Sequence, residues 1–223
     1  MAKTEELRFD VGVAARVSAV MVRPDKSKWL LVLGHGAGAG MRHPFMEALA
    51  EELARVGIAT LRYQFPYMED RRKAPDRPAV LTATVAAAIG AAAKAAPDLP
   101  LLAGGKSMGG RMTSQAAAEA LLPEVQGIVF FGFPLHPPKQ PGTKRAEHLL
   151  KVPVPMLFLQ GTRDDLADLK LLKPICKKLA KRATLHVIET ADHSFHVLKK
   201  SGRSDEEVLR ELAETTAAWA SLR

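Results

Sequence analysis

The sequence has few of the residues that cross-link a chain or stack on ligands. It contains one cysteine, Cys176, among 223 residues, so no intramolecular disulfide can form and a reducing compartment is permitted. Aromatic residues make up only 5% of the chain, which is too few for an evident platform on which nucleic-acid bases stack. The sequence predicts no metal site and no cofactor.

Long apolar segments are also missing. No apolar run approaches the length of a membrane span. The first six residues, Met1 to Glu6, are charged and lack the apolar core of a signal peptide. We therefore expect a cytoplasmic protein without a membrane partner.

The chain carries an excess of positive charge, with a formal net charge of +8. Its basic residues are dispersed, and the densest group lies in a helical pattern with apolar residues between, at Lys170, Lys173, Lys177, Lys178, Lys181 and Arg182. This arrangement favours a solvated helix face over a nucleic-acid site. Nucleic acid or another acidic partner stays an alternative.

Apolar runs alternate with helical patterns along most of the chain. A first pair of strands, 7–11 and 16–22, is predicted to be antiparallel. Further strands are expected at 29–33, 58–63, 101–103, 126–131, 156–159 and 184–188, and helices at 44–56, 80–96, 112–122, 169–181 and 205–222. The pattern predicts one α/β domain over residues 1–223, with a mainly parallel sheet and helices on both faces. Residues 66–78 and 132–150 are predicted to be loops, of which the second is the longest candidate for the wall of a pocket.

The segment between the strand 101–103 and the next helix contains Gly105-x-Ser107-x-Gly109. This spacing matches the nucleophile elbow of serine hydrolases, a sharp strand-to-helix turn that presents the serine at its tip. Glycine at both flanking positions avoids a collision with the serine side chain. A tight turn with a capping serine is the alternative interpretation.

Three more loops with reactive residues follow predicted strands, and the carboxyl ends of parallel strands share one edge of a sheet. The chain order there is Ser107, Asp164, His193, the order of α/β hydrolases. A histidine can take the proton of a serine hydroxyl, and a carboxylate holds the imidazole in the useful tautomer. Ser107, His193 and Asp164 are therefore the candidate nucleophile, base and orienting acid.

Each role has rivals nearby in the sequence. Asp165 is the second choice for the acid, whereas Asp168 is expected at a helix start. His196 is the rival of His193, three residues further on. His35 lies in the glycine-rich stretch 34–40, where we expect a structural hydrogen bond.

An oxyanion formed at Ser107 needs two hydrogen-bond donors. One is expected to be the backbone N–H of Met108, directly after the nucleophile. The second is expected from the glycine-rich stretch 34–40, at Ala37 or, as the alternative, at Gly38, which is also a candidate for substrate binding.

Arg111 is a further candidate for substrate binding. It falls in the first turn of the helix after the elbow, where the helix dipole disfavours a cation. A nearby carboxylate, from the protein or from the substrate, would explain it, and a structural salt bridge is the preferred explanation.

Two other motifs fit less well. Gly34-x-Gly36-x-x-Ala39 resembles a dinucleotide fingerprint, but the next strand ends near Arg62, where NAD binding needs an acid. Gly105-Lys106-Ser107 resembles the end of a phosphate-binding loop, but Pro100 occupies the position of the first glycine.

Four motifs together resemble a known group: His35 to Ala39, Gly105 to Arg111, Gln160 to Asp164 and Asp192 to Phe195. They are similar to those of small α/β hydrolases related to dienelactone hydrolases and to testis-expressed-30 proteins. The resemblance implies a three-layer α/β-hydrolase fold without a sizeable cap domain. It also implies a triad of Ser107, Asp164 and His193. Dienelactone hydrolases use a cysteine nucleophile, so their substrate is not carried over.

These observations favour a serine hydrolase acting on a small-molecule ester or thioester. The alternative is a hydrolase-fold protein that mainly binds an acidic partner. Nothing in the sequence indicates an oligomeric state.

Overall fold

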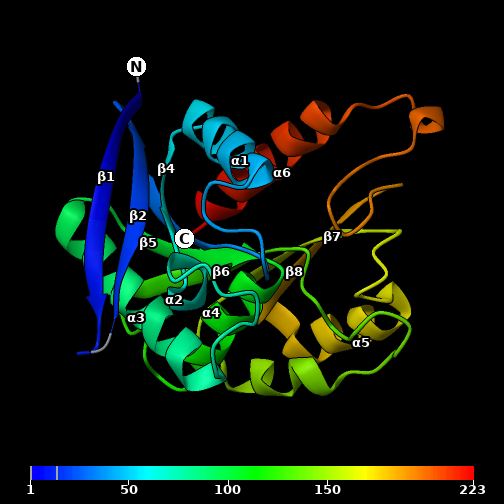
Figure 1. The fold of residues 1–223 in the computed structure, drawn as a ribbon. Coiled ribbons are helices and arrows are strands. Elements are labelled where there is room, and N and C mark those ends of the chain that lie inside the picture. Colours follow the sequence, from blue (N-terminus) through cyan, green and yellow to red (C-terminus); the bar gives the residue numbers. More distant parts are fainter. Residues whose placement is uncertain (1, 14) are drawn as a thin grey trace.

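A computed structural model describes residues 2–13 and 15–223, so Met1 and Ala14 lie outside the described part. Eight strands form one sheet in the order β1-β2-β4-β3-β5-β6-β7-β8, with helices on both faces (Figure 1). This arrangement confirms the predicted three-layer α/β-hydrolase fold.

The antiparallel part of the sheet lies at one edge. β1 (Ala2–Val11) pairs with β2 (Ala15–Pro24), and β2 pairs antiparallel with β4 (Ile58–Tyr63). Both strands are longer than the predicted 7–11 and 16–22. Residues 2–4 of the edge strand are exposed and mostly polar, so they carry no hydrophobic alternation from which a strand can be predicted.

The remaining strands run parallel, and all but the edge strand β8, which is half-buried, are buried on both faces as their continuous apolar runs predicted. They are β3 (Trp29–Gly34), β4, β5 (Leu101–Lys106), β6 (Val125–Phe131), β7 (Met156–Gly161) and β8 (Ala183–Ile188). Their carboxyl ends therefore meet at one edge, where the site described below lies.

Two helical layers enclose the sheet (Figure 1). α1 (Pro44–Arg55) and α6 (Asp205–Ala220) cover one face around Leu49 and Leu212. The other face is covered by α3 (Pro78–Ala95), α4 (Met108–Ala118) and α5 (Leu169–Leu179). Short 3-10 turns at Ala180–Arg182 and Lys199–Ser201 complete the regular structure.

Several other predicted boundaries were wrong. The expected loop 66–78 contains α2 (Pro66–Glu69), and Pro78 already begins α3. The expected loop 132–150 contains a 3-10 helix, Lys144–Lys151, which packs against α4. α4 starts and ends earlier than the predicted 112–122, because it begins directly behind Ser107 and is followed by Ala120 with a φ of 59°.

By length and composition alone, α3 is long and apolar enough to cross a membrane. This differs from the prediction that no apolar run approaches the length of a membrane span. Its apolar character comes largely from alanines. In the structure α3 packs against β1 and α4 and buries Leu81, Val85 and Ile89. These contacts place one face of α3 against the rest of the fold.

Candidate active site

The backbone at Ser107 is strained in the way an elbow requires. Ser107 lies between β5 and α4 with φ 51° and ψ −115°, a region that side-chain-bearing residues rarely adopt. A Cβ added to Gly105 or Gly109 would lie 2.3 Å or 2.2 Å from the Gly34 carbonyl oxygen. The prediction that side chains at these positions would collide with the serine side chain was therefore wrong. They would collide with the backbone of β3 at Gly34.

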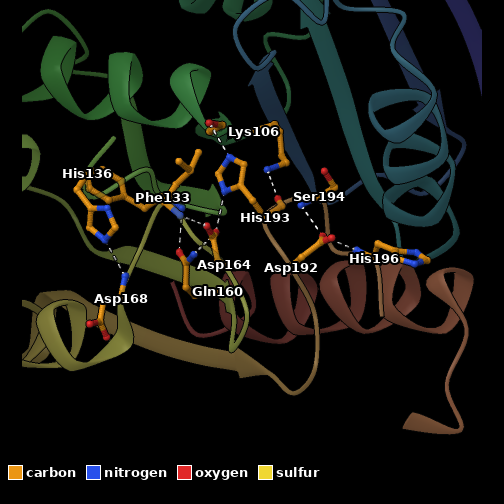
Figure 2. A network of polar contacts seen from close by, with 12 residues as sticks. Lys106, Phe133, His136, Gln160, Asp164, Asp168, Asp192, His193, Ser194 and His196 are labelled. Carbon is orange, nitrogen blue, oxygen red and sulfur yellow. Dashed lines mark hydrogen bonds and ion pairs between the residues drawn. The ribbon is translucent and has the colours of Figure 1, made fainter. Parts of the chain in front are cut away.

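The structure brings Ser107, His193 and Asp164 into one hydrogen-bonded chain. Nε2 of His193 lies 2.9 Å from the Ser107 hydroxyl, and Nδ1 lies 2.7 Å from the Asp164 carboxylate. Figure 2 shows the His193 ring pointing its Nδ1 at Asp164. The loops after β5, β7 and β8 supply the three residues, because those strands end at the same edge.

Asp164 is buried and held by several donors. Its carboxylate accepts hydrogen bonds from the Gln160 side-chain amide and from the Leu166 backbone N–H, the latter at 2.8 Å. The Gln160 carbonyl oxygen in turn accepts from the Phe133 N–H at 3.0 Å (Figure 2). These bonds fix the carboxylate that faces His193.

The rival residues lie in other environments. Asp165 is exposed, and Asp168 caps the start of α5 by accepting from the Lys170 N–H at 2.8 Å. His196 pairs with Asp205 at 2.7 Å.

Asp192 and Lys106 hold the loop that carries His193. The Asp192 carboxylate accepts from the backbone N–H groups of Ser194 and His196, at 2.8 Å and 3.0 Å (Figure 2). The Lys106 ammonium donates to the His193 carbonyl at 2.5 Å. Burial lowers the pKa of Lys106 from 10.5 to about 8. No sequence pattern pointed to these two positioning residues or to Gln160, although all three lie within four residues of a triad member.

The glycine-rich loop after β3 is fixed by His35. Burial lowers the pKa of His35 to about 4, so the ring is neutral. Its Nε2 accepts from the Phe65 N–H at 3.2 Å, so Nδ1 carries the proton and donates to the Gly36 carbonyl at 2.7 Å. The expected structural hydrogen bond is confirmed.

The contacts of this loop distinguish Gly38 from Ala37, the two candidates for the second donor to the oxyanion. The Gly38 N–H donates to the Tyr67 hydroxyl at 2.9 Å, so it is already engaged. Ala37 lines the two cavities beside Ser107 that are described below. Met108 begins α4 directly after Ser107. The arrangement favours Ala37 and Met108 over Gly38 as donors to an oxyanion.

A second serine–histidine pair lies on the other side of α4. Ser114 is 2.8 Å from Nε2 of His148, but its hydroxyl proton is donated to the Arg111 carbonyl. When Ser114 gives its single hydroxyl proton to this carbonyl, Nε2 of His148 acts as the donor in the contact with Ser114. Ser114 is buried, and neither cavity at Ser107 includes it.

Two cavities meet at Ser107. One, of about 320 Å³, is bounded by Phe45, Met46 and the His193 loop. The other, of about 380 Å³, is lined by Met108, Arg111 and residues of the segments 75–81 and 134–145. The prediction that residues 132–150 form a pocket wall is thus confirmed.

Arg111 does not have the predicted structural salt bridge. Among the residues that the structure describes, no carboxylate pairs with its guanidinium, and its side-chain contact is with Gln115 at 3.5 Å. Burial and the charge of Arg145 lower its pKa. The side chain lines the second cavity instead.

Within residues 2–13 and 15–223, no group of three or more His, Cys, Asp or Glu side chains is arranged to hold a metal ion.

Solved structures of the same fold include several hydrolases. A dienelactone hydrolase from Anabaena variabilis is 21% identical, with a TM-score of 0.78 over 98% of this chain and 96% of that one. XC6422 from Xanthomonas campestris, a serine hydrolase without a lid, is 19% identical, with a TM-score of 0.76 over 97% and 95%. Est1E from Butyrivibrio proteoclasticus is 17% identical, with a TM-score of 0.68 over 97% and 99%. At these identities the likeness concerns the fold.

The sequence itself matches a family profile described as an alpha/beta hydrolase domain, over residues 27–221. This match spans the parallel sheet, both helical layers and every residue of the site. The chain therefore belongs to the alpha/beta hydrolase domain family.

Proposed function

We propose that the chain is a serine hydrolase that cleaves a carboxylic ester or thioester through an acyl-enzyme on Ser107. The hydrogen-bonded chain from Ser107 through His193 to Asp164 is the observation that supports this most directly. We further propose that residues 1–223 act as one domain.

The first half of the reaction forms the acyl-enzyme. Nε2 of His193 accepts the hydroxyl proton of Ser107 while the serine oxygen attacks the carbonyl carbon. The resulting oxyanion accepts hydrogen bonds from the N–H groups of Met108 and Ala37. Asp164 stabilises the imidazolium, and Gln160 with Leu166 N–H keeps this carboxylate in place. This half ends when the carbon–heteroatom bond of the substrate breaks, the leaving alcohol or thiol takes the proton from His193, and the acyl group stays on Ser107.

The second half regenerates the enzyme. A water molecule gives its proton to His193 and its oxygen to the acyl carbon. The bond between the acyl carbon and the Ser107 oxygen then breaks, the acid leaves, and Ser107 recovers its proton from His193.

The two cavities have separate tasks in this scheme. Because His193 must protonate the leaving group, the cavity that His193 lines accepts the alcohol or thiol. The cavity beside Met108, on the other side of Ser107, accepts the acyl chain.

A fluorophosphonate probe tests the nucleophile. We expect wild-type protein to be labelled and the Ser107→Ala variant to be unlabelled. Ser114→Ala is the matched control and should be labelled as wild type, because Ser114 is buried and donates to a backbone carbonyl. Labelling that survives Ser107→Ala would overturn the assignment.

Turnover separates the enzyme from a protein that only binds an acidic partner. A panel of matched short esters and thioesters should be hydrolysed by wild type and not by His193→Ala. The ratio of the two substrate types decides between esterase and thioesterase. Absence of turnover across the panel would contradict the proposed function.

We also propose a cytoplasmic location. Burial raises the pKa of the Cys176 thiol to about 11, so this lone cysteine is an unreactive thiol that packs against the core. Recovery of the protein in the membrane fraction of lysed cells would contradict the proposal.

A further inference from the structure

The acyl-side cavity carries two arginines. Arg111, from the first turn of α4, and Arg145, from the 3-10 helix Lys144–Lys151, both line this space of about 380 Å³. Most of the other lining residues are apolar: Leu81, Met108, Met112, Leu166 and four prolines. Two guanidinium groups thus face a largely apolar cavity that opens onto Ser107.

Neither arginine has a carboxylate partner within the described residues. Among the described residues, the Arg145 side chain makes no hydrogen bond or ion pair, and the one hydrogen bond of the Arg111 guanidinium is with the Gln115 side chain at 3.5 Å. Asp76 is the one acid among the described residues of the lining. Its two oxygens are already engaged, at 2.6 Å from Arg72 and 2.8 Å from the Tyr67 N–H.

The position of Arg111 is unfavourable in the empty protein. A cation in the first turn of a helix opposes the helix dipole, and Arg145 adds a second positive charge close by. The charge of Arg111 also contributes to lowering the pKa of His148. An anionic group in the cavity would offset the unfavourable helix dipole and the repulsion between Arg111 and Arg145. A pair of guanidinium groups can hold a carboxylate by charge-assisted hydrogen bonds.

We propose that the substrate carries a carboxylate on its acyl chain, which Arg111 and Arg145 bind. The substrate class is then a monoester or monothioester of a short dicarboxylic acid. This inference rests on the proposed function for the direction of the acyl chain, but the carboxylate site itself rests on the cavity and its two arginines.

Matched substrates test the preference. Phenyl hydrogen glutarate and methyl phenyl glutarate differ only in whether the far end of the acyl chain is a carboxylate or its neutral methyl ester. With phenol release corrected for the uncatalysed rate, we expect wild type to have a kcat/KM on the order of 100-fold higher for the anionic substrate. Equal values, or a preference for the diester, would overturn the proposal.

Variants locate the preference. Arg111→Gln and Arg145→Gln should each reduce the ratio of anionic to neutral kcat/KM by roughly 10-fold, and the double variant should abolish it. Arg210→Gln removes an exposed arginine on α6, across the sheet, and should leave the ratio as in wild type. A ratio that is unaffected in the double variant would refute the role of the arginines.

Binding to Ser107→Ala separates this inference from the proposed function. By calorimetry, this variant should bind phenyl hydrogen glutarate roughly 100-fold more tightly than the diester, and the Arg111→Gln change should weaken binding of the monoester. This outcome supports the carboxylate site even if wild type hydrolyses neither substrate, a result that would count against the proposed function alone. Equal binding of both compounds would overturn the carboxylate site.

Discussion

Lys106 is a buried cation directly before the proposed nucleophile, and its replacement by methionine is predicted to stabilise the fold at neutral pH. Its ammonium donates to the His193 carbonyl and lies 5.8 Å and 5.4 Å from the ring centroids of Phe45 and Phe195. These contacts do not offset burial, which lowers the pKa from 10.5 to about 8.

The size of the effect follows from the pKa. The difference between the two values corresponds to roughly 3 kcal/mol by which the folded state disfavours the charged amine. Methionine fills similar space without the charge, and it loses one hydrogen bond, which contributes about 1 kcal/mol. We therefore expect Lys106→Met to raise the free energy of unfolding by about 2 kcal/mol at pH 7.

The sign of the pH dependence is fixed by proton uptake. Below pH 8 both the folded and the unfolded wild type hold the proton on Lys106. Between pH 8 and 10.5 the unfolded chain keeps a proton that the folded protein has released, so wild-type stability rises with pH. The advantage of the variant should therefore be smaller by about 1.4 kcal/mol at pH 9 than at pH 7.

Urea unfolding of both proteins at pH 7 and pH 9 measures this difference, with the slopes compared to exclude a change in the unfolded state. Lys94→Met, which removes an exposed lysine on α3, is the control and should change stability little at either pH. A difference between Lys106→Met and wild type that is the same at both pH values would refute the reasoning.

Three further predictions concern the site and its surroundings. Asp164→Asn should lower kcat for ester hydrolysis by about 10³- to 10⁴-fold, because His193 loses the partner that sets its tautomer; activity within tenfold of wild type would contradict this role. Gly109→Ala should destabilise the protein by about 3 kcal/mol in urea unfolding, since its Cβ would lie 2.2 Å from the Gly34 carbonyl oxygen; an unchanged midpoint would show that the contact relaxes. Burial and a neighbouring positive charge lower the pKa of His148 to about 4, so the unfolded chain takes up a proton as the pH falls through 6.5 while the folded protein does not. Between pH 7 and pH 5, His148→Gln should lose roughly 1 kcal/mol less stability than wild type, allowing for partial exposure of the ring; equal losses would exclude His148 as a source of acid sensitivity.

Local patterns were sufficient to predict the fold and the meeting of the triad residues. Buried parallel strands appear as continuous apolar runs, so β3, β5, β6 and β7 could be recognised without tertiary information. Once the sheet is known to be parallel, residues that follow its strands must share an edge. The proximity of Ser107, Asp164 and His193 follows from this geometry.

The supporting contacts could not be predicted, because they depend on how loops fold against one another. The Lys106 ammonium reaches the carbonyl of a residue 87 positions away in the chain. Tyr67, in a segment predicted to be a loop, engages the Gly38 N–H. The lack of a carboxylate at Arg111 is also a tertiary property, since the sequence contains 24 acidic residues that were available to pair with it.

The division of the space around Ser107 into two cavities affects how specificity can change. Phe45 and Met46 bound the cavity proposed for the leaving group, whereas the segment 134–145 bounds the cavity proposed for the acyl chain. Substitutions on separate, non-contacting walls are expected to add in free energy, so the choice of alcohol and the choice of acid can be altered by independent mutations. Ala37, Ser107 and Leu166 line both cavities, so a substitution at Leu166 would alter both sides.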